Sequence, residues 1–435
     1  MTERSILAAV SGIQANQTYL DSIGNNIANA DTIGYKDSQV QFQDLLAQQI
    51  SGATAPPAGG TGGGINPVAI GSGVRVAANE INLSEGSLEQ TGIPSDVAIQ
   101  GNGYLVVQSG GQQQYTRDGS LTTDANGNLT TQTGGLVQGW QAKNGVVSTS
   151  TPIGSIQIPQ GATIPANAST FIGITGNLPP WNGTTPATAP AYTTTYNAYD
   201  ALGNVVPVTL TFKPSAPTGT PSTTAWTVTG SVPNPAGGTS TPATITWTGL
   251  TFSNSTGQFV PSGATPNANG SYPLTGTGWP TWAAPFTLDV PAPSSSSAVT
   301  QFAAPSSIQA NSTDGYPPGT LQSYSIGQDG TITGSFSNGQ TQPLGQIALA
   351  NFANPAGLAD QGGGLFATSP NSGQALVGTP GTGGRGALLG GSLEQSNVNL
   401  GTELTNLITA QEAYTANTKV LTATNTVIQA LENVP

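Results

Sequence analysis

The sequence contains no cysteine and no histidine. These two absences exclude disulfide bonds, thiolate nucleophiles, imidazole acid–base chemistry and the usual zinc and copper sites. Charge is also scarce, because only 6% of the residues are charged, with 8 Lys and Arg against 20 Asp and Glu. The resulting formal net charge of −12 leaves no basic surface of the kind that binds nucleic acid or an anionic membrane. Solubility must therefore come from neutral polar side chains.

Long apolar runs are missing too. No segment contains the roughly 20 apolar residues of a membrane-spanning helix, so we expect no membrane insertion. The apolar run at residues 6–10 follows Arg4, but it is shorter than the roughly 7–15 residues of a signal-peptide core, and polar Ser11 comes next. We interpret it as part of an amphipathic helix that stays in the mature protein. If the protein is extracellular, we expect export without a cleaved signal peptide.

The composition favours several β-rich domains flanked by helices. A length of 435 residues suits two or three domains, and 59 Gly with 33 Pro suit many turns between short strands. Residues 1–50 and about 396–435 have helical patterns, whereas residues from about 70 to 395 have the pattern of β-structure. Residues 146–310 are richest in Thr, Pro, Ala and Ser, and residues 53–64 have the composition of a linker.

Both ends of the chain carry heptad-like apolar stripes. The N-terminal stripe comprises Ile6, Val10, Ile13, Gln17, Leu20, Gly24 and Ile27. The small residues beside it, which allow a neighbouring helix to approach closely, are Ala8, Ala9, Gly12 and Ala15. The C-terminal stripe comprises Leu400, Leu404, Leu407, Gln411, Tyr414, Thr418, Leu421, Asn425 and Ile428. No Pro or Gly interrupts residues 402–434, which predicts a helix of roughly 50 Å.

These two stripes need partners, because the apolar face of a helix is normally buried. They can pack on each other as an intramolecular helical hairpin, on the β-region, or on other subunits. Weak positions such as Gln17, Gly24 and Gln411 favour burial among several neighbours over burial against one strong partner. The heptad patterns therefore show that the helical ends need partners, and they leave open which of these three partners buries them.

Turn dipeptides divide the β-region into short apolar runs and predict hairpins. The candidates are Asn102-Gly103, Asp118-Gly119, Asn126-Gly127, Asn144-Gly145, Asp314-Gly315, Asp329-Gly330 and Asn338-Gly339. One hexapeptide also recurs, because Gly-Ser-Leu-Glu-Gln-Thr at 86–91 returns as Gly-Ser-Leu-Glu-Gln-Ser at 391–396. The first copy enters the β-region and the second leaves it. We therefore expect paired strands or matched connectors rather than coincidence.

Two segments resemble ligand-binding loops but lack the residues that such loops need. The Gly-Asn-Gly at 101–103 begins like a dinucleotide loop, but Val106 stands where the third Gly belongs and no helix follows. The segment from Asp124 begins like a calcium loop, but Leu129 and Gly135 replace its Gly and its closing Glu. A hairpin explains the first segment better, and a turn explains the second.

Carboxylates are the only plausible general acids that remain, and glycoside hydrolysis needs only a pair of them. Asp96, Asp200 and Asp289 lie far apart in the sequence, so nothing indicates that two of them meet. The six Trp residues lie between Trp140 and Trp282 and fit a β-sandwich core better than a sugar-binding platform. We therefore predict no enzyme activity and no catalytic, cofactor-binding or metal-binding residues.

The terminal segments carry a more specific signal. Residues 21–36 read Asp-Ser-Ile-Gly-Asn-Asn-Ile-Ala-Asn-Ala-Asp-Thr-Ile-Gly-Tyr-Lys, an Asn-rich turn at the end of the first stripe. The C-terminal stripe contains Ser396 to Leu400, Glu403-Leu404, Ile408, Ala410-Gln411, Tyr414 and Asn417. Both segments resemble the matching helices of the flagellar rod and hook proteins. One position departs from that family, because Glu412 stands where a basic residue is usual.

The middle of the chain extends this resemblance. Residues 96–104 and 115–119 resemble the start of the family's inner β-domain, and residues 344–352 resemble the return through it. About 165 residues separate these halves, whereas rod proteins are shorter and lack a large outer domain. Residues 199–204 resemble a segment of a hook outer domain, and residues 315–319 resemble the re-entry to the inner domain. The resemblance therefore favours a hook protein over a rod protein.

The resemblance implies a mixed fold, mainly β with terminal α-helices, in discontinuous nested domains. The implied parts are a coiled-coil-like helical assembly layer at 1–30 and 396–435, a connecting segment at 31–70, an inner β-domain at 71–145 and 311–395, and an inserted outer β-domain at 146–310. The function implied is that of a structural subunit of the bacterial flagellar hook, polymerising into a curved flexible tube that couples rod to filament and transmits torque. A rod-type axial protein and a secreted β-rich adhesive or carbohydrate-binding protein are the alternatives.

The resemblance also implies partners, location and assembly residues. The partners would be identical subunits, the rod, hook-cap and hook–filament junction proteins, and the flagellar export apparatus, with no cofactor and no nucleic acid. The location would be extracellular, in the hook and basal body of the flagellum. The expected assembly residues are Ile6, Val10, Ile13, Leu20, Asn25, Asn26, Ile27, Asn29, Leu400, Leu404, Leu407, Gln411, Tyr414, Asn417, Leu421 and Ile428.

Overall fold

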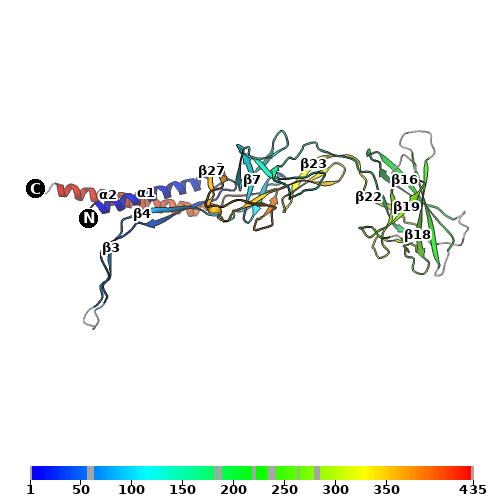
Figure 1. The fold of residues 1–435 in the computed structure, drawn as a ribbon, viewed down its shortest axis with the longest axis horizontal. Coiled ribbons are helices and arrows are strands. Elements are labelled where there is room, and N and C mark those ends of the chain that lie inside the picture. The colour runs from blue at the N-terminus through cyan, green and yellow to red at the C-terminus, as the bar shows by residue number, and fades with distance from the viewer. Residues whose placement is uncertain are drawn as a thin grey trace. The chain divides into compact units, whose positions relative to one another are not determined.

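The computed structural model of the chain describes residues 2–55, 63–180, 183, 189–217, 222–233, 242–261, 263, 265–278 and 285–432. Many short strands lie between two long helices, α1 (Thr2–Ala28) and α2 (Leu400–Glu432). The helices pack side by side and antiparallel, so that α1 begins near the end of the pair at which α2 ends (Figure 1). The predicted mixed fold, mainly β with paired terminal helices, is confirmed.

The chain forms two compact units, each built from separate chain segments. The first contains Met1–Gln160, Ser323–Gly334 and Thr341–Pro435, and the second contains Gly161–Gln322 and Ser335–Gln340. Two strands, β23 (Gly319–Ile326) and β24 (Thr331–Phe336), include residues of both units. The four-part division expected from the sequence is finer than this one, and it stays a proposal.

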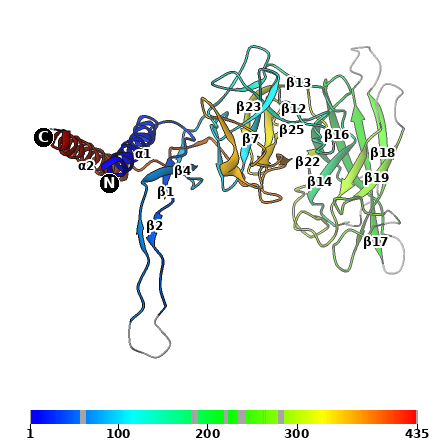
Figure 2. The same ribbon diagram turned by 60° about the vertical axis from the view of Figure 1, so that its left-hand side comes forward.

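Beside the helices, the chain forms an antiparallel pair of strands that continues into an arm (Figure 2). β1 (Ser38–Asp44) pairs with β4 (Val74–Ile81), and in the arm β2 (Gln48–Ser51) pairs with β3 (Val68–Ile70). The helical pattern expected over residues 1–50 is therefore wrong beyond Ala28. From residue 38 the sequence reads Ser-Gln-Val-Gln-Phe-Gln, which alternates with the two-residue period of a strand. Within the expected linker at 53–64, residues 56–62 lie outside the described residues.

The other strands of the first unit form one β-sheet and two short ladders. They are β5 (Leu88–Gln90), β6 (Val97–Gln100), β7 (Tyr104–Ser109), β8 (Gln112–Thr116), β9 (Leu121–Thr123), β10 (Leu129–Thr131), β11 (Leu136–Gln141), β12 (Gly154–Ser155), β25 (Thr341–Ile347), β26 (Leu349–Asn351), β27 (Ala359–Gly362), β28 (Leu365–Ala367), β29 (Leu376–Gly378), β30 (Ala387–Gly390) and β31 (Ser392–Glu394), with a 3-10 turn at Pro355–Gly357. The sheet runs β25-β11-β7-β8-β28-β27, and β30 pairs with β6 outside it. Its core includes Tyr104 and Tyr115, whose rings pack edge-on against Phe352 at centroid distances of 5.8 and 4.8 Å.

The second unit is built on a mostly antiparallel sheet. Its strands are β13 (Thr163–Ile164), β14 (Phe171–Asn177), β15 (Tyr192–Tyr199), β16 (Val205–Pro214), β17 (Thr223–Val232), β18 (Ala243–Ser253), β19 (Tyr272–Thr277), β20 (Thr287–Val290), β21 (Val299–Thr300) and β22 (Gln309–Thr313). The main path runs β15-β16-β17-β18-β19-β20-β14-β21. In β17, buried Thr224, Trp226 and Val228 alternate with more exposed residues, so one face of the strand packs into the core.

The tryptophans that the structure describes are core residues, as predicted. Trp226 and Trp247 are 2% and 0% exposed in the second unit, and Trp140 is 5% exposed in the first. The other three, Trp181, Trp279 and Trp282, lie outside the described residues.

Four of the seven predicted hairpins are confirmed. Asn126-Gly127 joins β9 to β10, Asp329-Gly330 joins β23 to β24, and Asn338-Gly339 joins β24 to β25. Asn144-Gly145 closes the bridge between Lys143 and Val146 with positive φ angles of 51° and 75°. The predictions at Asn102-Gly103, Asp118-Gly119 and Asp314-Gly315 are wrong, because the strands on either side of each turn pair with other strands. A turn dipeptide specifies a local bend, but it does not determine with which strand the following strand pairs.

The repeated hexapeptide forms paired strands, as expected. Leu88–Gln90 in β5 lies antiparallel to Ser392–Glu394 in β31, so the two copies form one ladder where the chain enters and leaves the β-region. The approach is close, since a Cβ on Gly86 would lie 2.0 Å from the carbonyl oxygen of Gln395. Only glycine fits at that position.

Candidate assembly surface

The two helices approach each other through small side chains. Gly12 of α1 faces Asn417 of α2, and a Cβ on Gly12 would lie 2.8 Å from the Asn417 Nδ2 atom. The residues of α1 that are buried are Ala9, Gly12, Ala15, Ser22, Ile23 and Asn26. This buried stripe lies about one residue N-terminal to the predicted one, a rotation of about 100° around the helix.

The predicted N-terminal stripe lies on the flank of this contact. Ile6, Val10, Ile13, Leu20 and Ile27 are all half-buried, whereas Gln17 and Gly24 are exposed. Of the small residues expected to let a neighbouring helix approach closely, Ala9, Gly12 and Ala15 are buried, and Gly12 faces Asn417 of α2. Their lack of bulk explains the difference, because small side chains let two helix backbones approach more closely than branched ones do.

The predicted stripe of α2 consists of two rows of residues, each with a seven-residue spacing. The row at 400, 407, 414, 421 and 428 is buried in part, and the row at 404, 411, 418 and 425 is mostly exposed. Leu407, Leu421 and Ile428 are half-buried, but Leu400 and Tyr414 of the same row are 47% and 36% exposed. The residues one position before the row at 404, 411, 418 and 425 are more buried. Glu403, Ala410 and Thr424 are buried, and Asn417 is half-buried. Leu404 is consequently 50% exposed, and Gln411 is also exposed.

Large apolar side chains therefore remain on the surface of the helix pair and the arm. On the helices, Ile408, Val420 and Val427 are 58%, 45% and 52% exposed, and Leu7 is 64% exposed. On the arm and beside it, the exposed apolar residues are Phe42, Leu46, Ile50, Ile65, Val68 and Ile70. Grouped apolar exposure of this kind is typical of surfaces that another protein covers. We call these helix and arm residues, together with Leu400 and Leu404, the assembly surface.

The Asn-rich turn holds the chain where it leaves α1. Buried Asn26 accepts a hydrogen bond from the Ser38 backbone N–H at 3.0 Å and donates one to the Ser38 carbonyl at 2.9 Å. The Tyr35 hydroxyl donates to Asn26 Oδ1 at 3.1 Å. The Asn29 side chain donates to the Asn25 carbonyl at 2.9 Å, which adds a second bond to the one from the Asn29 backbone N–H. Within this chain, these three asparagines thus fix the direction in which β1 leaves α1.

A buried ion cluster ties the terminal segments to the β-sheet. Glu394 has no exposed side-chain surface and bonds Lys36 Nζ at 2.6 Å and Arg117 Nε at 3.0 Å. The Gly86 backbone N–H also donates to Glu394, at 3.0 Å. The Arg117 guanidinium further donates to the Gly103 carbonyl at 3.3 Å. The side chain of Glu394 thereby joins segments from four parts of the sequence.

Sequence reasoning missed this cluster although each of its members lay in a segment that attracted attention. Lys36 ends the Asn-rich turn, Arg117 lies in the inner-domain segment, and Glu394 lies in the repeat. Glu394 is separated from Lys36 by 358 residues and from Arg117 by 277 residues. No local pattern connects such distant residues. The signal that was available is the scarcity of charge. In a chain with only 8 Lys and Arg, a basic residue inside a motif is a candidate for an ion pair with an acidic residue of another motif.

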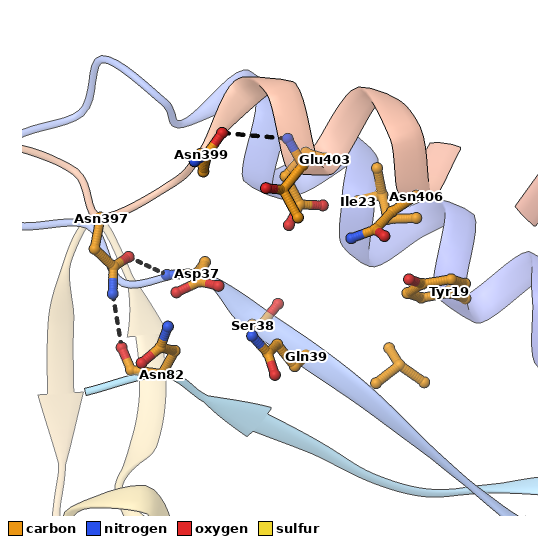
Figure 3. Close-up of a pocket in the computed structure, with 12 residues that line it drawn as sticks. Tyr19, Ile23, Asp37, Ser38, Gln39, Asn82, Asn397, Asn399, Glu403 and Asn406 are labelled. Carbon is orange, nitrogen blue, oxygen red and sulfur yellow. Dashed lines mark hydrogen bonds between the residues drawn. The ribbon is translucent and has the colours of Figure 1, made fainter. Parts of the chain in front are cut away.

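A pocket of about 370 Å³ opens where α1, α2 and β1 meet (Figure 3). Asp37 and Glu403 line it and are 6% and 7% exposed. Asp37 Oδ1 and Glu403 Oε2 are buried and have no hydrogen-bond partner among the described residues. Burial raises the pKa of Glu403 above its ordinary value of 4.5, a hydrogen bond from the Asn26 side chain opposes this shift, and the negative charge of Asp37 adds to it. The pocket thus has two acidic groups and no cation.

The carboxylates considered for catalysis each accept a hydrogen bond from a nearby polar group. Asp96 accepts a hydrogen bond from the Thr91 hydroxyl at 2.6 Å, and Asp200 accepts one from the Asn204 backbone at 2.8 Å. Asp289 accepts one from the Asn267 side chain at 2.6 Å. Asp124 accepts bonds from the backbone of Asn126 and Asn128, so the segment that begins like a calcium loop is a turn, as expected.

Neither α1 nor α2, over its described residues, is apolar over enough of its length to cross a lipid bilayer.

Models of four protein families match successive parts of this chain. Residues 6–36 match "Flagella basal body rod protein", and residues 389–434 match "Flagellar basal body rod FlgEFG protein C-terminal". Residues 98–177 match "Flagellar hook protein FlgE/F/G D1 domain", and residues 163–316 match "Flagellar basal body protein FlaE D2 domain". The matches thus include both helical ends and most of the β-region.

Similar proteins are known from several bacteria. The flagellar hook protein FlgE of Borreliella burgdorferi is 33% identical over 98% of both chains. The FlgE proteins of Escherichia coli and Salmonella typhimurium are 32% and 34% identical over 98% and 99% of both chains. A solved structure, the hook protein FlgE2 of Helicobacter pylori, is similar with a TM-score of 0.49 and 16% identity, covering 69% of this chain and 98% of that one.

Proposed function

Because this chain belongs to the flagellar hook protein FlgE family and is a structural subunit of the hook, we propose that its assembly surface packs copies into the hook tube. The observation that carries the proposal is the apolar surface left on the paired helices, with Leu404 and Ile408 at 50% and 58% exposed. Burial of one such side chain contributes about 1.5–3 kcal/mol. Repeated along the helices and the arm, contacts of this size favour a polymer over a soluble monomer.

The residues expected from the sequence have graded roles in this proposal. Leu400, Leu404, Gln411 and Tyr414 are exposed enough to contact another subunit directly. The half-buried residues border the contact between the helices, where a second copy can complete their burial; these are Ile6, Val10, Ile13, Leu20, Ile27, Leu407, Asn417, Leu421 and Ile428. Asn25, Asn26 and Asn29 act indirectly, by setting the angle between α1 and the strands that lead to the arm.

We also propose how the hook subunit works mechanically. The helical ends form an inner tube around a channel, residues 31–70 connect it to the inner β-domain at 71–145 and 311–395, and the outer domain at 146–310 lies on the surface. The tube is curved and flexible, and it couples rod to filament while transmitting torque. The low charged content of 6% supports this flexibility, since β-domains with few charges can slide past one another with few ion pairs to break. Within the described residues, both salt bridges belong to the internal Glu394 cluster.

The subunit belongs to the flagellar hook and basal body, as its FlgE relatives indicate. We propose further that it is extracellular and leaves the cell through the flagellar export apparatus without a cleaved signal peptide. Its proposed partners are further copies of itself and the rod, hook-cap and hook–filament junction proteins. The role is structural, without catalysis. A rod-type or adhesive role is not favoured, because hook proteins match over nearly the whole chain.

A paired substitution tests the proposed assembly surface. Leu404→Asn with Ile408→Asn should leave the monomer folded, because both side chains are half-exposed or more, and should raise the critical concentration for polymerisation by about tenfold or more. Light scattering across a concentration series measures this threshold. The control is Leu202→Asn, a leucine that is 80% exposed in the second unit. Equal thresholds for the paired variant and the wild type would refute the proposal.

A further inference from the structure

We propose that the pocket holding Asp37 and Glu403 receives the ammonium group of Lys419 from a second copy of this chain. The inference rests on the proposed assembly of copies and names one specific contact within it. It begins from an imbalance, because two carboxylates that are 6% and 7% exposed share a pocket with no cation (Figure 3). A buried charge without a partner is unfavourable.

Among the described residues, no basic side chain lines this pocket. Lys36 precedes Asp37 in the sequence, but its ammonium group is bound to Glu394 at 2.6 Å. The backbone N–H of Asp37 is also occupied, because it donates to Asn397 Oδ1 at 2.8 Å. Oδ1 of Asp37 and Oε2 of Glu403 remain without a hydrogen-bond partner among the described residues. The pocket thus contains two carboxylate oxygens that can each accept a hydrogen bond from a donor on another molecule.

The chemistry of the pocket suits an ammonium group better than a metal ion. Within the described part of the chain, no group of three or more acidic side chains could hold a metal. The other lining residues are mostly neutral and polar, among them Ser38, Asn82 and Asn399. An ammonium group has three N–H donors, which two carboxylates and one amide or hydroxyl oxygen can satisfy together.

Lys419 is the basic residue placed to reach this pocket from a neighbouring copy. It is exposed on α2 and forms no salt bridge within the described residues. It lies about four and a half turns beyond Glu403 and about 160° around the helix, so it points away from α1. A second copy displaced by about 24 Å along the helix axis would bring its Lys419 level with this pocket. Such a contact joins different surfaces of the two copies, and contacts of that type build helical polymers.

A double-mutant cycle on the full-length chain tests the contact. Glu403→Gln and Lys419→Gln should each raise the critical concentration for polymerisation by about tenfold or more, while circular dichroism shows a folded monomer. The double variant should polymerise no worse than either single variant, since each change removes the same ion pair. The matched controls are Glu412→Gln, an exposed acid on the same helix, and Lys143→Gln, an exposed lysine outside the helices. Both controls should polymerise like the wild type.

Four results would overturn the assignment. The first is single variants that polymerise like the wild type, and the second is effects that add in the double variant. The third is coupling of Glu403→Gln to Arg4→Gln instead, because Arg4 is the other basic residue of the helix pair. The fourth is calcium or magnesium binding by the wild-type monomer, measured by calorimetry and lost in Asp37→Asn. A wild-type chain that never polymerises would contradict the proposed function. A wild-type chain that polymerises, together with single variants that polymerise equally well or effects that add, would contradict this contact alone.

Discussion

Glu394→Gln should strongly destabilise the first unit. The change keeps the shape of the side chain and an acceptor for the Gly86 N–H, but it removes the charge that Lys36 and Arg117 share. Those two basic side chains are only 3% and 5% exposed, so water cannot replace the lost carboxylate. Breaking a buried ion pair on one side costs about 3–5 kcal/mol. We expect the lower end, about 3 kcal/mol, because Arg117 also donates to the carbonyls of Ile99 and Gly101.

Hydrogen exchange measured by mass spectrometry separates this effect from general damage. A loss of about 3 kcal/mol raises exchange through global opening by roughly 100-fold. The increase should appear in β6 and β7 of the first unit, while β17 and β18 of the second unit stay protected and serve as an internal control. Glu89→Gln is the matched control variant, since Glu89 is exposed and its side chain accepts a hydrogen bond from the side chain of Gln395.

The cluster has no central role if Glu394→Gln exchanges like the wild type in β6 and β7. A uniform increase in both units would also refute the reasoning, because it would mean that the effect does not act through Lys36 and Arg117.

Two further predictions concern the helices. Gly12→Ala should give a helix pair that is less stable than that of Gly24→Ala by about 1 kcal/mol, measured by thermal unfolding followed by circular dichroism. The reason is that a Cβ at residue 12 would lie 2.8 Å from Asn417, whereas a Cβ at residue 24 meets nothing within 4 Å. Equal stabilisation by both substitutions would contradict the observed register. Because the pKa of Glu403 is raised on folding, the folded chain binds this proton more tightly than the unfolded chain, and stability falls as pH rises from 4.5 through the raised pKa. Glu403→Gln should remove that fall and make the monomer more stable near neutral pH, as denaturant titrations at several pH values can show. A variant less stable than the wild type at pH 7 would contradict this prediction.

Patterns of short range predicted the structure well where neighbours in sequence are also neighbours in space. The Asn126-Gly127 hairpin and the helices at both ends follow from local periodicity and turn chemistry. The ladder of β5 with β31 could be predicted across about 300 residues only because the same hexapeptide occurs twice. Repetition made a long-range contact visible in the sequence.

The registers of the helices could not be read from apolar spacing alone. Ile13 and Leu20 mark a stripe by hydrophobicity, but Gly12 faces Asn417 of α2, and Ala9 and Ala15 of the same helix are buried. The bulky stripe is then left partly exposed. In a polymer this is no contradiction, since one chain holds only part of the surface that buries its side chains. The Glu394 cluster was invisible for a different reason, because its partners are hundreds of residues apart.

Electron microscopy of the concentrated full-length protein shows directly whether the chain polymerises. The wild-type chain should form short curved tubes with a central channel that α1 and α2 line. The paired variant Leu404→Asn with Ile408→Asn should show few tubes at the same concentration, and Leu202→Asn should show as many as the wild type. A wild-type chain that stays monomeric at high concentration, or that forms only straight rigid rods, would contradict the account.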